Sequence, residues 1–455
     1  MPPLGGEYRP STTRHRRDGV KSGTINMTYR YAFVLGRVYT LSLAELFFYF
    51  QNHGWTVKIV DISHEVLIVE TDEQLEVQKI QRELGGVVKI LKVLDEVKKK
   101  ETDYINFALQ NYFKPSKLKR DFLHNLKGKI QFGISVYLLD PELSAFGEPK
   151  RLGMFIKRAM QEAGASIRLV LPQFNSLTLA SVVVTHNNLL TKGAEICVLA
   201  SPTKLYVAKT LSVQDFEDYG RRDYQRPVRD DKQGMIPPKV AQMMVNFAGA
   251  KPNEILLDPF CGIGTIIQEG VLQGYKMLGT DINPVAIAGS EKNLEWFRNR
   301  YKISKGKYHV ETSDVAEVSK VIEHLKQVGA FPQVSGIVTE GYLGPIYGEF
   351  PSPAEIKANF EQLTQLYTKA FQDYVKFLSK GAKVVMCLPA YKKGDSYIQL
   401  ENLDFIKDIG YNLVDLIPNN LAESLPFLKL TDRATAIYDR KDQIVAREII
   451  IFEKL

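Results

Sequence analysis

Residues 254–270 read EILLDPFCGIGTIIQEG and decide the fold of the C-terminal half of the chain. The apolar run 255–257 predicts a buried strand that ends at Asp258. A turn containing Gly262 and Gly264 then leads into a helix. Glycines at these places permit an unusual backbone turn and the close approach of a ligand to the helix N-terminus. The turn lacks the lysine of a phosphate-binding loop, so a triphosphate ligand is not expected.

Two further strands are predicted to end at acidic residues. YKMLGTDI ends near Asp281, about 20 residues beyond the turn, where an acid can accept hydrogen bonds from both ribose hydroxyls of an adenosine. KYHVETSD ends at Asp314, in a place suited to accept a hydrogen bond from an adenine amino group. Each acid also precedes a plausible helix start, so a helix cap is the alternative role of either one. Three strand-end acids in register with a Gly-rich turn favour a site for an adenosine ligand.

The chain of 455 residues is too long for one compact core. We predict an α/β protein of five segments: a disordered basic tail (1–26), a ferredoxin-like α+β module (27–100), a second α+β module (105–212), a polar linker that begins the donor site (213–240) and a Rossmann-like domain with a doubly wound parallel sheet (241–455).

Three local patterns give finer expectations. VLDEVKKKE (93–101) is interpreted as a Lys-rich linker, and LTLASVVVTHN (177–187) as a strand. The two apolar runs of 434–454 predict a hairpin that closes an edge of the sheet. Ser352 and Glu355 form a capping box with proline at the first helical position, which predicts a helix start.

Composition narrows the class of protein. The net charge of +7 is a mild indication of an anionic partner. Its 3 cysteines are widely scattered, which argues against a disulfide framework or a thiolate zinc site and favours a reducing cytoplasm. No segment has the apolar length of a membrane-spanning helix, and no metal is expected.

DPFCGIGT closely resembles the D-P-F/M-C-G-S/T-G-T signature of amino-directed RNA methyltransferases. The resemblance implies a Rossmann-like domain that uses S-adenosylmethionine as its methyl donor. The residues that it assigns to the donor are Asp258, Gly262 and Gly264 at the amino-acid end, Asp281 at the ribose and Asp314 at the adenine.

The fourth predicted strand, VSGIVTE, leads into GYLGP. Amino methyltransferases carry D/N-P-P-Y/F/W here, which accepts hydrogen bonds from the target amine and stacks on a base taken out of its own stack. In this chain Glu340 stands at the acid position, Gly341 replaces the prolines, and Tyr342 follows one residue early. We predict Glu340 as the acceptor and Tyr342 as the stacking platform. The alternative is a protein that binds RNA but no longer methylates it.

The segment R-D-Y-x-R-P-x-R-D-x-x-x-G-M-I-P-P-K is strongly similar to the one that precedes the catalytic domain in archaeal and eukaryotic tRNA guanosine-10 N2-methyltransferases. The resemblance implies that Met235 and Pro237 lie against the donor. Arginine and tyrosine interleaved there also suit RNA contact, whereas a solvated linker is the alternative. The predicted contacts are Arg221, Arg222, Arg226 and Arg229.

Residues 105–212 look like a THUMP domain, the RNA-gripping module of this family, with Lys157 and Arg158 as phosphate contacts. The resemblance implies methyl transfer to the exocyclic N2 of a tRNA guanosine, with position 10 as the expected target. Ribosomal RNA, another nucleic-acid amine and a non-catalytic tRNA-binding role stay open. The sequence leaves undecided whether one or two methyl groups are added and whether a small activating subunit is needed.

Overall fold

The computed structural model describes residues 7–8, 28–124, 128–145, 148–229, 235–331, 333–440 and 443–455. The predicted tail of residues 1–26 lies outside the described residues, apart from the short strand at 7–8. Contacts divide the chain into two compact units. Unit 1 comprises Met1–Tyr39, Gly54–Glu83 and Val87–Phe216, and unit 2 comprises Thr40–His53, Leu84–Gly86 and Glu217–Leu455.

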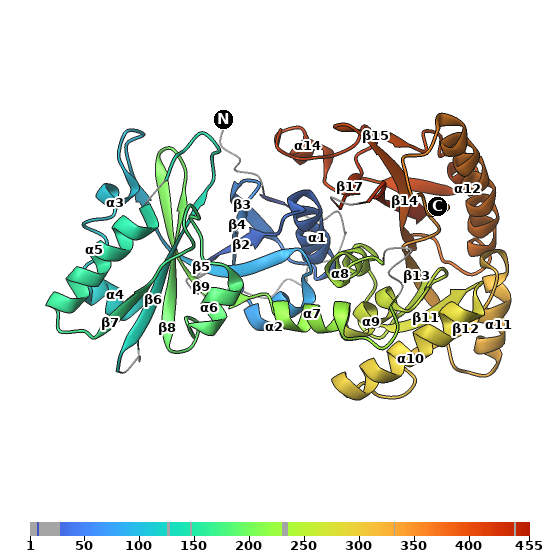
Figure 1. Cartoon of the computed structure of the whole chain (residues 1–455), viewed down its shortest axis with the longest axis horizontal. Helices are drawn as coiled ribbons and strands as arrows, with labels where there is room; N and C mark the ends of the chain where they lie inside the picture. The colour runs from blue at the N-terminus through green and yellow to red at the C-terminus, as the bar shows by residue number, and fades with distance from the viewer. Residues whose placement is uncertain are drawn as a thin grey trace, which may run out of the picture. The chain divides into compact units, whose positions relative to one another are not determined.

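Unit 1 is built on one sheet with the order β1-β3-β4-β2-β5-β9-β8-β6-β7 (Figure 1). Strand β6 is parallel to β7 and β8, and the other neighbours are antiparallel. The strands are β1 (Glu7–Tyr8), β2 (Tyr29–Leu35), β3 (Val57–Ile62), β4 (Val66–Thr71), β5 (Val87–Lys98), β6 (Ile130–Leu138), β7 (Ile167–Val170), β8 (Gly193–Ala200) and β9 (Lys204–Val213). Its helices are α2 (Val77–Glu83), α3 (Ile105–Ala108), α4 (Pro115–Asp121), α5 (Glu148–Glu162) and α6 (Ser181–His186).

The chain from β2 to β5 has the β-α-β-β-α-β element order of a ferredoxin-like module. The expected linker at 93–101 is wrong for most of its length, because β5 continues to Lys98 and pairs with β9. Its charged residues Asp95, Glu96 and Lys98 are partly buried or exposed, and Asp95 pairs with Lys117. The strands of the two predicted N-terminal modules therefore share one sheet.

The expected strand at 177–187 is also wrong. Residues 181–186 form helix α6. Its approach to β6 holds two isolated hydrogen bonds, from Val136 N to Leu177 O at 2.8 Å and from Leu179 N to Ser135 Oγ at 2.9 Å. Both sides of β6 are already paired, by β7 and by β8. The helix instead packs Val184 between Leu179 and Leu189, so tertiary packing overrides the β propensity of the three valines.

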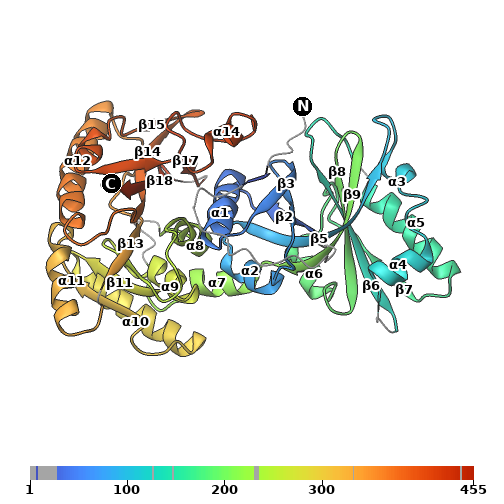
Figure 2. The same cartoon turned by 180° about the vertical axis from the view of Figure 1, so that it is seen from behind.

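Unit 2 is built on a second sheet with the order β12-β11-β10-β13-β14-β18-β16, in which β10 to β14 are parallel (Figure 2). This arrangement confirms the predicted Rossmann-like fold. The chain reverses its direction of winding between β10 and β13, and ligands of such sheets bind beyond the carboxyl ends of the strands at this switch point. The strands are β10 (Ile255–Asp258), β11 (Lys276–Asp281), β12 (Tyr308–Thr312), β13 (Val334–Thr339), β14 (Lys383–Lys393), β15 (Ser396–Gln399), β16 (Tyr411–Val414), β17 (Ala436–Tyr438) and β18 (Val445–Lys454).

Helix α12 starts where the capping box predicted it. Ser352 accepts from Glu355 N, while the Glu355 carboxylate accepts from Ser352 N. The buried face of α12 includes Leu363 and Phe371. It packs on the sheet in one hydrophobic cluster with Val384 of β14.

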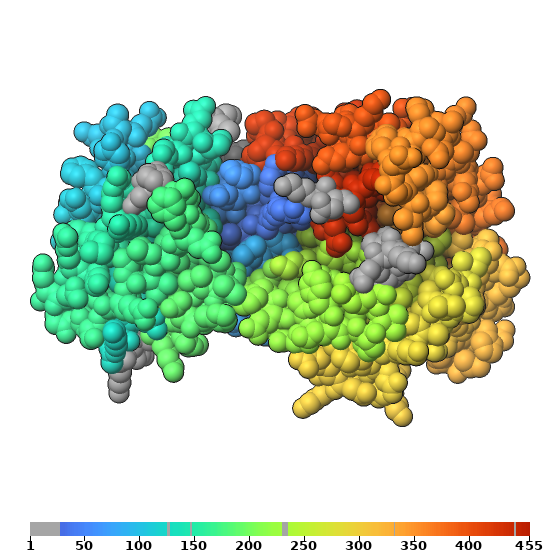
Figure 3. Space-filling model, in the orientation of Figure 1, coloured from blue at the N-terminus to red at the C-terminus, as the bar shows by residue number. Residues whose placement is uncertain are grey.

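The surface of unit 2 in Figure 3 includes α10, drawn in yellow. The helices of this unit are α1 (Tyr39–Asn52), α7 (Phe216–Tyr224), α8 (Pro238–Phe247), α9 (Thr265–Leu272), α10 (Pro284–Tyr301), the 3-10 helix η1 (Val315–Glu317), α11 (Val318–Gln327), α12 (Pro353–Tyr374), α13 (Asp404–Lys407) and α14 (Asn419–Ala422).

Helix α1 belongs to unit 2 although its sequence lies among the strands of unit 1. The reason is a buried carboxylate. Glu45 is 0% exposed and accepts hydrogen bonds from Gly85 N, Gly86 N and Asn246 Nδ2, at 2.8, 2.8 and 2.7 Å. A buried acid without such donors would cost several kcal/mol, so these contacts fix where the helix packs.

The predicted C-terminal hairpin forms between β17 and β18, but it does not close the sheet edge. Strand β18 lies between β14 and β16, and both of its faces are buried along most of its length. A long apolar run is typical of such an interior strand. Among the described residues, no helix is both long enough and apolar enough to cross a membrane.

A buried ion pair holds the centre of unit 1 together. Lys89 Nζ lies 2.5 Å from Glu195 Oε1 and donates to Leu179 O at 2.7 Å, and the two charged side chains are 2% and 0% exposed. Ser135 and Thr210 donate to the same carboxylate, at 2.5 and 2.6 Å. Because every oxygen has a donor, the pair is tolerated in a dry interior.

We predict that Glu195→Gln lowers the free energy of opening β5 and β8 by about 3–5 kcal/mol, because the Lys89 charge would stay buried without a counter-ion. Hydrogen exchange of the peptides that cover these strands measures this. Glu96→Gln breaks the exposed pair with Arg30. It should change the free energy of opening these strands by less than about 1 kcal/mol. Equal protection in both variants would contradict the predicted cost.

Candidate active site

The Gly-rich turn between β10 and α9 has the backbone that its sequence predicted. Gly262 and Gly264 have φ of 50° and 87°, and Gly264 is the N-cap of α9. A Cβ on Gly264 would lie 2.6 Å from Ser290 Oγ, so packing requires a glycine there. A Cβ on Gly262 would meet nothing within 4 Å, so the turn presents bare backbone to open space. This cradle suits the close approach of a ligand.

Asp281, at the end of β11, contacts this turn directly. Its Oδ2 accepts from Gly262 N at 2.9 Å, and its Oδ1 accepts from Asn283 N at 2.9 Å. Asn283 in turn caps α10. The structure therefore brings together the acid and the turn that the sequence assigned to one ligand, while the carboxylate also fixes both neighbouring segments.

Asp314 follows β12 at the same edge of the sheet and is exposed. Its Oδ1 accepts from Ala316 N at 2.9 Å and caps η1. The capping role that the sequence offered as an alternative is thus present, and its predicted contact with adenine stays a prediction.

Asp258 is fully buried, and burial raises the pKa of its carboxyl to about 7. Its Oδ1 accepts from Thr339 Oγ1 at 2.7 Å. The same hydroxyl accepts from Gly341 N at 3.2 Å. Thr339 is the last residue of β13, so one side chain joins the predicted donor strand to the predicted acceptor turn.

The acceptor turn after Glu340 lacks the two prolines of the D/N-P-P pattern but is held by hydrogen bonds. Gly341 has a φ of 72°, and a Cβ there would lie 2.6 Å from the Tyr367 hydroxyl. That hydroxyl donates to Tyr342 O at 2.7 Å, and Asn359 Nδ2 donates to Leu343 O at 3.2 Å. Both donors stand on α12. Long-range contacts thus supply the rigidity that prolines would give.

The two predicted acceptor residues differ in their surroundings. Glu340 is partly buried, and its Oε1 accepts from Arg447 Nε on β18 at 2.5 Å. The side chain of Tyr342 is exposed. A carboxylate that can accept hydrogen bonds and an aromatic ring open to stacking therefore follow the same strand.

Part of unit 2 matches a known protein family. Residues 226–320 match the family described as UPF0020, RMKL-like, methyltransferase domain. This range holds the Gly-rich turn and the strand-end acids Asp258, Asp281 and Asp314.

Two archaeal relatives extend the match. A tRNA (guanine(10)-N2)-dimethyltransferase of Methanothermobacter thermautotrophicus is 29% identical over 165 residues, which cover 36% of this chain and 42% of that protein. A probable tRNA (guanine(10)-N2)-dimethyltransferase of Methanothermococcus thermolithotrophicus is 32% identical over 125 residues, 28% of this chain and 68% of the relative. The chain belongs to the tRNA guanosine-N2 methyltransferase family. It spans less than half the length of the first of these relatives.

A crystal structure of TrmN from Thermus thermophilus aligns with 94% of this chain and 100% of its own, with 14% identity and a TM-score of 0.49.

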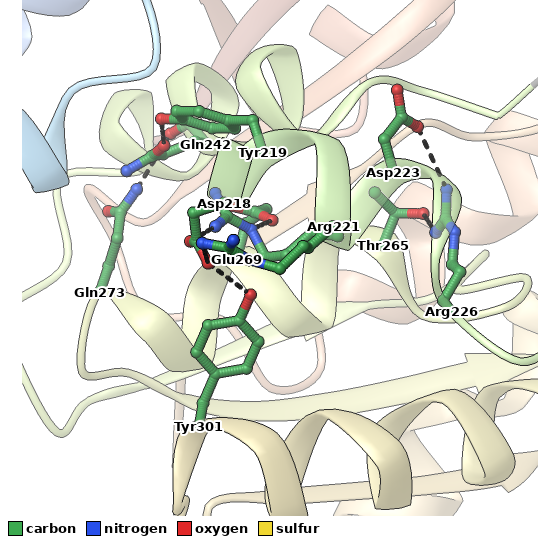
Figure 4. Close-up of polar contacts among 11 residues, drawn as sticks. Asp218, Tyr219, Arg221, Asp223, Arg226, Gln242, Thr265, Glu269, Gln273 and Tyr301 are labelled. Carbon is green, nitrogen blue, oxygen red and sulfur yellow. Dashed lines mark hydrogen bonds and ion pairs between the residues drawn. The ribbon is translucent and has the colours of Figure 1, made fainter. Parts of the chain in front are cut away.

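Two arginines that the sequence assigned to RNA are buried in this family member. The side chain of Arg222 is 5% exposed and donates from Nε and Nη2 to Glu269, at 2.6 and 3.1 Å. Burial alone would lower the Arg222 pKa, but the charge of Glu269 raises it above its ordinary value. Arg226 is buried and donates to Thr265 Oγ1 at 2.6 Å, at the start of α9. Figure 4 shows the contact between Arg226 and Thr265.

The RNA-contact interpretation of Arg222 and Arg226 is therefore corrected. Their guanidinium groups anchor the segment before the catalytic domain onto helix α9 instead of facing solvent. The arginine-rich pattern could not reveal this, because the buried acid Glu269 that Arg222 pairs with lies 47 residues away.

The other predicted contacts are closer to the surface. Arg221 pairs with Glu217 and Asp218, and the exposed Arg229 lies 5.2 Å from the ring of Tyr224. Lys157 and Arg158 are partly buried and exposed on α5. Met235 and Pro237 are partly buried just before α8, and Pro237 is its N-cap.

Sequence reasoning missed Thr339 and Arg447. A signal for Arg447 existed: Arg447 and Glu448 interrupt an otherwise apolar strand, and both are buried. Charged residues inside such a strand need partners, but the sequence does not say which ones.

We predict that Thr339→Val lowers the stability by about 1–3 kcal/mol, because the buried Asp258 carboxyl would keep only the longer hydrogen bond from Phe260 N and Gly341 N would lose its acceptor. The loss should be larger at pH 8 than at pH 5.5, since the ionised carboxylate needs the hydroxyl most. Thermal unfolding at the two pH values measures it. Thr368→Val removes only a hydrogen bond within α12 and serves as the control. Equal losses of stability in both variants, with no dependence on pH, would contradict the predicted role of the Thr339–Asp258 hydrogen bond.

Proposed function

We propose that this protein transfers a methyl group from S-adenosylmethionine to the exocyclic N2 of guanosine 10 in tRNA. The observation that carries the proposal is the Asp258–Thr339–Gly341 link, which joins a predicted donor turn to a predicted acceptor turn at the switch point of the sheet. The names of the two archaeal relatives support the choice of guanosine N2 and of tRNA.

The donor would lie over the bare backbone of the Gly-rich turn. Its ribose hydroxyls would share the Asp281 carboxylate, and its adenine amine would reach Asp314. Its amino-acid end would approach Asp258, Met235 and Pro237. When bound, the donor supplies an electrophilic methyl group on a sulfonium.

The guanine would leave its stack and rest on Tyr342, which is open to solvent. Glu340 would accept a hydrogen bond from the N2 amine and turn the nitrogen lone pair toward the methyl group. The N–C bond forms as the C–S bond breaks, and one amine proton passes to solvent. Most of the rate gain then comes from orientation.

The tRNA would bind through cations that the structure leaves near the surface. We propose Lys157 and Arg158 on α5 and Arg221 and Arg229 near α7 for phosphate contacts. Salt should weaken such contacts strongly. A cytoplasmic location agrees with this substrate.

The activity test incubates the whole protein with labelled S-adenosylmethionine and unmodified tRNA transcripts, followed by mass spectrometry of the nucleosides. We expect label in N2-methylguanosine or N2,N2-dimethylguanosine at position 10. A transcript with inosine at position 10 lacks the exocyclic amine and should accept none. Label in another RNA or another nucleoside would overturn the choice of substrate. No transfer despite donor and tRNA binding would favour the non-catalytic alternative.

A second prediction concerns the buried carboxyl of Asp258. Because its pKa is raised to about 7, the folded protein keeps this proton between about pH 4 and 7, where an unfolded chain has lost it. Ionisation therefore costs stability as the pH rises. A cationic group of bound S-adenosylmethionine near Asp258 would favour the ionised carboxylate. Binding of S-adenosylmethionine should therefore release a proton from Asp258. Below pH 7, the affinity for S-adenosylmethionine should rise by up to about tenfold per pH unit.

Calorimetric titration of S-adenosylmethionine at pH 6.5 in buffers of different ionisation heat measures this proton release. Asp258→Asn should abolish it. Asp373→Asn alters another buried acid, which bonds Ser319, and should leave it unchanged. Proton release that persists in Asp258→Asn would remove Asp258 from the donor site.

A further inference from the structure

Arg447 approaches the acceptor turn from two strands away. It lies on β18, which pairs with β14, and β14 in turn pairs with β13, the strand that ends just before Glu340. Its side chain is 3% exposed. Nε donates to Glu340 Oε1 at 2.5 Å, and Nη1 donates to Gln443 Oε1 at 2.7 Å. The guanidinium thus reaches past β14 to hold the carboxylate.

This contact decides where the Glu340 carboxylate lies. Glutamate is one methylene longer than the aspartate or asparagine of the D/N-P-P pattern, and its side chain has one more rotatable bond. Arg447 draws the carboxylate back toward the sheet and removes that freedom. Among the described residues, no side chain donates to Glu340 Oε2. One oxygen is therefore fixed by the arginine, and the other is left to accept from a ligand.

The charges around Glu340 favour the same arrangement. Glu340 faces Asp258 on β10, Cys387 on β14 and Tyr367 on α12. Burial raises the pKa of each of these three groups most, and the Glu340 charge raises each pKa further. Arg447 is the cation in this group. Burial alone would lower the Arg447 pKa, but the Glu340 charge raises it, so the arginine stays charged. A carboxylate oxygen can accept a hydrogen bond from an amine while the other oxygen stays paired with a charged guanidinium.

We propose that Arg447 is a positioning residue for methyl transfer: it fixes the Glu340 side chain so that one carboxylate oxygen can accept a hydrogen bond from the target amine. The inference rests on the proposed function, because Glu340 acts on the substrate only if this site methylates an amine. It adds to that function a residue on β18 that acts solely through Glu340.

The test compares Arg447→Gln, Arg447→Lys and Glu340→Gln with the double variant Glu340→Gln/Arg447→Gln. Single-turnover methylation of tRNA is measured together with donor affinity, tRNA affinity and melting temperature. Arg433→Gln breaks a neighbouring pair with Glu448 and serves as a matched control that leaves Glu340 untouched.

We expect Arg447→Gln to lower the single-turnover rate on the order of 100-fold, the size of effect that a misplaced group causes. Its donor and tRNA affinities should stay within about twofold, because neither ligand contacts Arg447 directly. Arg447→Lys keeps the cation and should recover part of the rate. Adding Arg447→Gln to Glu340→Gln should cost little more, since the arginine acts through that carboxylate.

Three results would overturn the proposal: an unchanged rate in Arg447→Gln, full additivity in the double variant, or a rate loss in Arg433→Gln as large as in Arg447→Gln. If Arg447→Gln does not fold, the comparison of Arg447→Lys in the two Glu340 backgrounds decides the question. A wild-type protein that methylates no tRNA would refute the proposed function itself, whereas an active wild type with an indifferent Arg447 refutes this inference alone.

Discussion

The pairing of β10 with a parallel neighbour on each side is the constraint on which the rest of unit 2 depends. Because β11 and β13 flank it, the turns after all three strands emerge at one edge of the sheet. The Gly-rich turn, Asp281 and the acceptor turn are far apart in the chain but become neighbours there. Thr339 then joins Asp258 to Gly341 with one hydroxyl. The site is thus a consequence of strand order, refined by a few hydrogen bonds.

Buried charged side chains fix which segments pack around this site. Arg222 on α7 is paired with Glu269 on α9, the helix that the Gly-rich turn begins. A pair of this kind adds little net stability compared with apolar packing, but a chain that misplaces either partner leaves a charge without a counter-ion. The buried Glu45 carboxyl fixes α1 in unit 2 through hydrogen bonds from Gly85 N and Asn246 Nδ2 instead of a counter-ion. Buried polar groups here specify which segments meet.

The sequence predicted local features well and distant ones poorly. Three features each depend on a few adjacent residues: the Gly-rich turn, the strand-end acids and the capping box of α12. Sequence pattern and propensity were therefore enough to predict them. The β-branched run in 181–186 became a helix because β6 had no free side, which is a property of the whole sheet. Arg222 and Arg226 were mistaken for surface residues because their partners lie 47 and 39 residues away.

The acceptor turn shows how a local departure can be offset by distant contacts. Two prolines would restrict the backbone through covalent geometry alone. Here Gly341 enters a positive φ that leaves no room for a Cβ beneath Tyr367, and hydrogen bonds from Tyr367 and Asn359 hold the carbonyls that follow. Arg447 then fixes the one side chain that such a turn would leave loose. Rigidity of this origin depends on α12 and β18 being folded, so the geometry of the acceptor turn is coupled to the packing of the whole unit.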